Sequence, residues 1–147
     1  MTDFIGIRMN VAQILAEHGI DCRITHTHVT EEKFSNSPGT YEVDHYSARF
    51  TNRHNRHVFV TSYSVGEGCR DRKVHPADIL SVVFSDADVL NYDTFEEWAI
   101  DVGLDPDSRR VEKAFNDGNR NVLALWSFLE SIDSGLFSEL ENTLQDY

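Results

Sequence analysis

The sequence has little cysteine and no long apolar run, and both absences narrow the classes of protein that it fits. Cys22 and Cys69 lie far apart and form no CxxC motif, so we expect neither a disulfide framework nor a zinc module. No apolar run approaches the ~20 residues that cross a bilayer. The first residues also lack the charged-then-apolar order of a signal peptide. We therefore expect a soluble cytoplasmic protein with no direct membrane contact.

Basic residues are also scarce, and almost all of the deficit lies in one half of the chain. Thirteen Lys and Arg stand against 25 Asp and Glu, which gives a formal net charge of -12. Residues 1–75 hold nine residues of each sign, whereas residues 76–147 hold sixteen acids and four bases. Between Val74 and Ser108 there are nine acids and no Lys or Arg. This balance argues against nucleic acid as a general partner and indicates an electrically polar molecule.

A length of 147 residues with 40% hydrophobic residues favours one domain with a substantial core. In the net neutral part, residues 1–75, the apolar spacing predicts a helix from Asn10 to Gly19. Period-2 alternation then predicts a strand from Ile20 and two more strands near 41–50 and 57–65, joined by a short hairpin connection. The turn-rich segment 30–40 is predicted to be a loop.

In the acidic part, residues 76–147, the spacing of the apolar residues changes to the 3.6-residue period of a helix. Pro76 fits the first position of a helix whose apolar arc continues to Leu90. Acids predicted to lie outside that arc are Asp78, Asp86 and Asp88.

Two more helices are predicted from their capping residues. Thr94 and Glu97 form a capping box for a helix that ends at Gly103. Asp105 is predicted to cap a long third helix, with Pro106 at its first position.

A last short helix is predicted near 135–145. The predicted fold class is α+β: a small antiparallel sheet with a hairpin, followed by a helical cluster, in one domain over 1–147. Trp98 and Trp126 fall on the apolar stripes of their helices, so both are predicted to be core residues.

The patterns of catalytic and metal-binding proteins are absent. His26 and His28 would project from one side of a strand, but no ligand spacing forces three or four donors to converge, so we expect no metal and no cofactor. Cys69 precedes a basic run that would lower its pKa, yet no motif places a base beside it. With no GxSxG elbow and no phosphate loop, we expect no enzymatic activity and assign no catalytic residue.

Two surfaces remain as candidate binding sites. The first is the predicted hairpin, which carries Arg49, Arg53 and Arg56 in position to contact phosphates. Its aromatic residues, Tyr41, Tyr46 and Phe50, would stack on bases. The simpler explanation is a solvated hairpin, which we favour. The other surface is acidic and would occupy a basic groove of a partner protein, through Asp86, Asp88, Asp93, Glu96, Glu97 and Asp101. Carboxylates at i and i+4 on a helix lie ~6 Å apart, which is of the order of phosphate separations along a strand.

The stretch from His75 to Phe115 carries a resemblance. It contains Phe95-Glu96-Glu97-Trp98, then Gly103-Leu104-Asp105-Pro106-Asp107-Ser108-Arg109, then an aromatic residue. The pattern resembles a widespread family of small acidic phage and prophage accessory proteins, whose typical form is F-E-x-W followed by G-Y-D-x-D-S-R-K-A-E. Here Leu104 replaces the usual Tyr, Arg110-Val111 replace Lys-Ala, and residues 1–30 lie outside the resemblance.

The resemblance implies a context of mobile elements and of accessory genes that counter host defence, among which anti-CRISPR proteins are frequent and some imitate DNA. The leading hypothesis is therefore an inhibitor of a bacterial nucleic-acid-targeting defence system, acting by stoichiometric binding in the host cytoplasm. Its partner would be an effector protein with a basic nucleic-acid-binding groove. The alternative is a phage accessory module that binds nucleic acid through the arginine hairpin. The sequence leaves the oligomeric state open.

Overall fold

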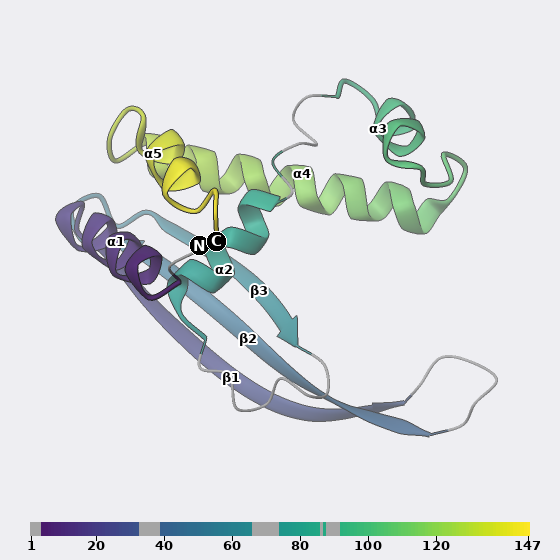
Figure 1. Ribbon diagram of the computed structural model, residues 1–147, viewed down its shortest axis with the longest axis horizontal. Helices are drawn as coiled ribbons and strands as arrows, with labels where there is room; N and C mark the ends of the chain where they lie inside the picture. Colours follow the sequence, from purple (N-terminus) through teal and green to yellow (C-terminus); the bar gives the residue numbers. More distant parts are fainter. Residues whose placement is uncertain (1–3, 33–38, 66–73, 86, 88–91) are drawn as a thin grey trace.

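The computed structural model describes residues 4–32, 39–65, 74–85, 87 and 92–147. Within them the order of elements is helix, three strands, then four helices (Figure 1). The elements are α1 (Phe4–Glu17), β1 (Ile20–Glu32), β2 (Thr40–Asn52), β3 (Val58–Val65), α2 (Pro76–Ser85), α3 (Phe95–Val102), α4 (Arg109–Glu130) and α5 (Leu136–Thr143). The predicted α+β fold class is confirmed.

The strands form one antiparallel sheet in the order β1-β2-β3. Register places Cys22, Phe50 and Phe59 across from one another, so that they share one face. The helices lie on one side of this sheet, and β1 and β2 extend beyond them at the end near residues 32 and 40 (Figure 1). One sheet face is therefore the floor of the core and the other faces away from the helices.

The main core joins the sheet to α1, α2, the second half of α4, and α5. It is a single cluster in which Phe50 is 1% exposed and Val122 is fully buried. The predicted last helix is confirmed, because the segment near 135–145 buries Leu136, Phe137, Leu140 and Leu144. This cluster is where most apolar area leaves water, so it supplies most of the driving force for folding.

A second, smaller cluster joins α3 to the first half of α4. Its buried members are Phe95, Ala99 and Phe115, with Tyr92, Trp98 and Val111 packed around them. We call this cluster the α3 core. In Figure 1, α3 lies beside α4 at the end that is distant from α1 and α5. The α3 core therefore depends on α4 for its attachment to the rest of the fold.

Two predicted helix starts are wrong. The first helix begins at Phe4 and not at Asn10, because Phe4 and Arg8 contact Tyr147 and extend the helix through tertiary contacts. The long helix α4 begins at Arg109 with Ser108 as its N-cap, whose hydroxyl accepts from the Val111 N–H. Asp105 instead accepts the Asp107 N–H at 2.9 Å, so this acid closes a separate turn before the helix.

Two predicted burial assignments are also wrong. Asp78, placed outside the apolar arc of its helix, is only 6% exposed because Arg8 reaches it from α1. Trp126, assigned to the core, is 48% exposed, while Trp98 is half-buried beside Phe115. Trp126 lies at the edge of the α4 stripe, and none of the described helices covers it fully.

The helix that starts at Pro76 ends at Ser85, and the arc predicted to continue to Leu90 falls largely outside the described residues.

Candidate functional site

The acidic residues of α3 form an exposed surface on a well-defined helix. Thr94 is the N-cap, with its hydroxyl accepting from the Glu97 N–H at 3.2 Å. Gly103 ends the helix at φ 81°, a left-handed conformation that glycine adopts without strain. Both caps were predicted, and both are confirmed. They fix the orientation of the helix and hence of the side chains that it presents to solvent.

Four of the six predicted acidic site residues lie here and are exposed: Asp93, Glu96, Glu97 and Asp101. Ile100 stands among them, 67% exposed, one helical turn from Glu96 and from Glu97. We call these five residues the acidic α3 surface. The remaining predicted residues, Asp86 and Asp88, lie outside the described residues.

Helix stability explains only part of this surface. Glu96 and Glu97 lie in the first turn of α3, where the helix dipole favours negative charge. Asp101 lies in the last turn, where the dipole disfavours an acid, and its one hydrogen bond is from the Tyr92 hydroxyl at 3.0 Å. In the described part of the chain, none of the four carboxylates has an ion-pair partner. Among the described residues, this surface is thus negative without a compensating base, and it includes the exposed apolar residue Ile100.

The arginine hairpin is arranged differently from the prediction. Arg49 is exposed on the sheet face away from the helices, directly across from Arg23 of β1. Arg53 forms an ion pair with Asp21, Nε to Oδ2 at 3.2 Å. Arg56 is exposed in the turn with φ 62°.

A buried amide holds this turn in place. Asn52 is 2% exposed; its side chain donates to the His18 carbonyl and accepts from the His54 and Asn55 N–H groups. The aromatic residues expected to stack bases are not available, because Tyr46 and Phe50 are buried in the sheet floor. Tyr41 has no described side chain. The hairpin is therefore a rigid, partly neutralised turn and not a stacking platform.

The histidines meet a carboxylate at the far end of the sheet. His26 Nε2 and His28 Nδ1 lie 2.7 and 2.8 Å from the same oxygen of Asp44, which is 4% exposed. Hydrogen bonds from His26 and His28 hold the pKa of Asp44 below its usual range. Across the described residues, no three His, Cys, Asp or Glu side chains converge in a way that could hold a metal ion.

The cysteines offer no candidate nucleophile among the described residues. Burial raises the pKa of the Cys22 thiol to about 11, which leaves it unreactive near neutral pH. Cys69 lies outside the described residues.

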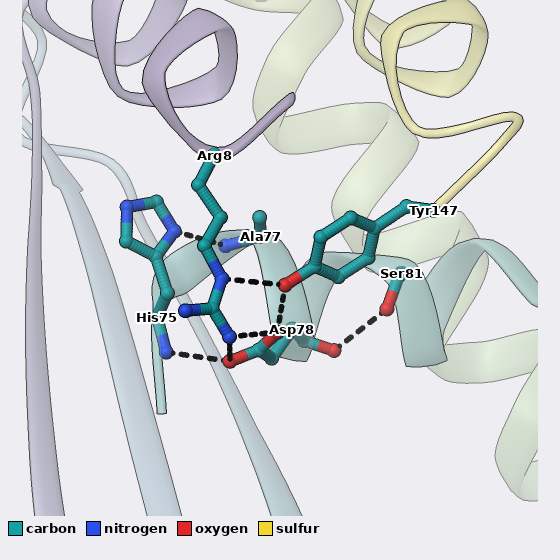
Figure 2. A network of polar contacts seen from close by, with 6 residues as sticks. All are labelled: Arg8, His75, Ala77, Asp78, Ser81 and Tyr147. Atoms are coloured by element: carbon teal, nitrogen blue, oxygen red, sulfur yellow. Dashed lines mark hydrogen bonds and ion pairs between the residues drawn. The ribbon is translucent and has the colours of Figure 1, made fainter. Parts of the chain in front are cut away.

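A polar network that the sequence analysis missed joins α1, α2 and residue 147 (Figure 2). Arg8 donates to both Asp78 oxygens at 3.1 and 3.0 Å and, through Nε, to the Tyr147 hydroxyl at 2.8 Å. The Tyr147 hydroxyl donates to Asp78, and the His75 N–H donates to Asp78 at 2.8 Å. The His75 ring accepts from the Ala77 N–H and so caps α2.

This network is a structural clamp. Burial would raise the pKa of Asp78, but hydrogen bonds from Tyr147, the His75 N–H and Arg8 outweigh burial and hold that pKa below its ordinary value. The carboxylate oxygens are both engaged by protein donors, which leaves no lone pair aimed at a substrate. A sequence signal was present: an acid at the third position of a helix often reaches back to the N-cap N–H.

Comparison of the chain with protein-family models, with curated proteins and with solved structures finds no match. In the part of the chain that is described, no helix is long and apolar enough to cross a membrane.

Proposed function

We propose that the protein is a stoichiometric inhibitor of a bacterial nucleic-acid-targeting defence complex, which it blocks by inserting the acidic α3 surface into a basic groove. The observation that carries this proposal is a set of exposed carboxylates on α3 and just before it, none with an ion-pair partner among the described residues, together with the exposed Ile100. Its context, an accessory gene of a mobile element acting in the host cytoplasm, rests on the sequence resemblance.

The composition of the surface suits protein binding better than solubility alone. Acids that serve only solubility are interspersed with bases, whereas residues 74–108 contain no Lys or Arg. Interfaces combine an apolar centre with a polar rim, and here Ile100 is the centre while Asp93, Glu96, Glu97 and Asp101 form the rim. Rim charges mainly accelerate association with a basic partner, so binding should weaken as salt screens them.

The small α3 core supports the same proposal. Phe95 and Phe115 pack with ring centroids 6.2 Å apart, and Trp98 lies 5.3 Å from Phe115. These contacts pack α3 against α4 and so set the position of the helix that carries most of the carboxylates. A pre-organised surface loses less entropy on binding than a mobile one.

A second candidate function is nucleic-acid binding through the arginine hairpin. The observation in its favour is the adjacent pair Arg23 and Arg49 on the sheet face away from the helices. Against it, Asp21 neutralises Arg53, and the stacking residues Tyr46 and Phe50 are buried. Phosphate contacts without base stacking would give weak, salt-sensitive affinity in a protein with this net charge.

The test is a phage challenge of bacterial strains that each carry one defined nucleic-acid-cleaving defence system. Expression of the protein is expected to restore plaque formation in at least one strain, and a variant with Arg49, Arg53 and Arg56 changed to Glu is expected to retain that effect. A labelled duplex titrated with the pure protein should show no binding at physiological salt. Loss of rescue in the arginine variant together with duplex binding would replace the inhibitor proposal with the nucleic-acid one. No rescue in any strain would contradict the inhibitor proposal directly.

A further inference from the structure

The strand β3 is an open sheet edge. In the sheet order β1-β2-β3 it pairs with β2 on one side only. Among the described residues, no hydrogen bond from another element reaches its backbone on the other side. An unpaired edge of this kind is a template for pairing with a further strand.

The hairpin register identifies which residues face the open side. The Asn52 N–H donates to the His57 carbonyl, so the hydrogen-bonded pairs to β2 continue through Phe59, Thr61 and Tyr63. The backbone N–H and C=O groups that point away from β2 therefore belong to the alternate residues, Val58, Val60, Ser62 and Ser64. All four of these residues also have exposed side chains.

This edge lacks the features that protect exposed strands. Native edges are commonly protected by charges or proline, and β3 has neither in its sequence VFVTSYSV. The opposite edge strand, β1, does carry charges, among them Asp21 and Arg23. Val60 is 53% exposed and Val58 is 39% exposed at the open edge. The β3 edge thus combines exposed apolar side chains with backbone groups that find no partner within the described parts of the chain.

A groove follows the same edge between β3 and α4. One part is lined by Val60, Thr61 and Ser62 with Ala114, Gly118 and Ala124 of α4, and the next part by Val58 with Ala124 and Phe128. Asn121 of α4 donates to the Thr61 hydroxyl at 3.1 Å and fixes the helix beside the strand. The charged residues of the groove wall are Asp117 and Arg120, one of each sign. This surface is therefore close to neutral in a chain of net charge -12.

We propose that β3 is the dimer interface of the protein, where two copies pair their β3 strands antiparallel about a two-fold axis and form one continuous six-stranded sheet. A second copy fits this edge better than an unrelated chain, because an uncharged strand can face itself without like-charge repulsion. Pairing centred on Thr61 places Val58 opposite Ser64 and Val60 opposite Ser62 of the other copy. All outward backbone groups then find partners, in about eight hydrogen bonds, which is within the number found at a typical interface.

The same axis brings the two α4 helices together beneath the extended sheet. The small residues Ala114, Gly118 and Ala124 line the groove there and allow close approach. Asp117 already forms ion pairs with Lys113 and Arg120 of its own copy, at 2.8 and 3.9 Å, so it brings no unpaired negative charge to the axis. Self-association at a surface away from the acidic helices avoids the repulsion that two strongly acidic molecules would otherwise experience.

Sedimentation equilibrium over a wide concentration range tests this inference on the full chain. Wild type is expected to be dimeric. Val60→Lys places a charge next to the axis, opposite Ser62 of the other copy, and Ser62→Pro removes one outward N–H that β2 does not use. Each is expected to raise the dissociation constant tenfold or more. Ile5→Lys is the matched control, because it makes the same kind of change at an exposed apolar residue of α1. Circular dichroism checks that each variant is folded.

Amide hydrogen exchange supplies the second readout, independent of any variant. The N–H groups of Val58, Val60, Ser62 and Ser64 should be protected at high protein concentration and should lose protection on dilution, whereas those of Phe59 and Thr61 should stay protected throughout. A monomer at every concentration would overturn the inference and leave the edge to an extended segment of another protein. A dimer that Ile5→Lys disrupts and Val60→Lys does not would overturn it in favour of α1.

Discussion

The main core and the α3 core differ in size, in attachment and in the surface that each supports. The main core draws on the sheet and on four helices, and its members include Phe50, Leu125 and Leu140, each at most 1% exposed. The α3 core has three buried residues and packs on one helix. The larger core holds the fold, whereas the smaller one holds a single short helix with its acidic side chains outward. We therefore attribute stability to the main core and propose binding for the surface that the α3 core supports.

The largest expected effect is the loss of a large side chain from the main core. Phe50→Ala should lower the free energy of unfolding by about 3–5 kcal/mol, because Phe50 contacts Phe59 across the strands and the change leaves a cavity. Urea-induced unfolding followed by circular dichroism measures this change. The expected result is a cooperative transition at lower urea concentration.

The matched change in the α3 core is Phe115→Ala, also a buried phenylalanine. Here the main core should persist, so the midpoint of global unfolding should move less than for Phe50→Ala. Amide exchange should instead accelerate selectively in α3. If Phe115→Ala lowered global stability as much as Phe50→Ala, the two cores would unfold together and the comparison would fail.

An intermediate effect is expected from the clamp around Asp78. Asp78→Ala leaves Arg8 and Tyr147 without their shared acceptor and should cost about 1–3 kcal/mol at pH 7. Since the pKa of Asp78 in the folded protein is lower than its ordinary value of 3.8, its contribution is present above that value and is lost as pH falls through the folded pKa. Unfolding curves of wild type and variant should therefore converge in acid. A difference that stays constant from neutral pH into strong acid would exclude the ionised carboxylate as its cause.

A smaller effect is expected at Trp126, which lies in the half of α4 that contributes to the main core. Since this side chain is 48% exposed, Trp126→Ala should cost only about 1 kcal/mol. In variants that keep one tryptophan, acrylamide should quench Trp126 more strongly than Trp98. Equal quenching would show that a neighbouring element covers Trp126 in solution.

The sequence predicted the elements better than it predicted what covers them. Strands, the hairpin, the caps Thr94 and Gly103, and the last helix follow from local periodicity and capping chemistry, and all are present. Trp126 was misplaced because periodicity identifies the stripe of a helix but not how far its neighbours reach across it. Asp78 was misplaced because its partners, Arg8 and Tyr147, are distant in sequence.

For the candidate sites too, local features were predicted correctly and contacts between distant segments were not. Local spacing correctly placed Glu96, Glu97 and Asp101 on the exposed side of α3. It could not show that Asp21 would neutralise Arg53, because that ion pair depends on the pairing of β1 with β2. Nor could it show that β3 would be an edge strand, since strand order is a property of the assembled sheet. Contacts between distant segments are what the sequence pattern does not contain.

The most direct test of the central claim reverses the charge of the acidic α3 surface in the phage-challenge assay. The variant changes Asp93, Glu96, Glu97 and Asp101 to Lys, and the matched control makes four equivalent changes in α1, α5 and the residues after α5, at Glu17, Glu139, Glu141 and Asp146. Both variants alter the net charge equally, and circular dichroism is used to verify that both are folded. We expect that the α3 variant no longer restores plaque formation while the control does so as well as wild type. Equal activity in the two variants, or loss in the control alone, would contradict it.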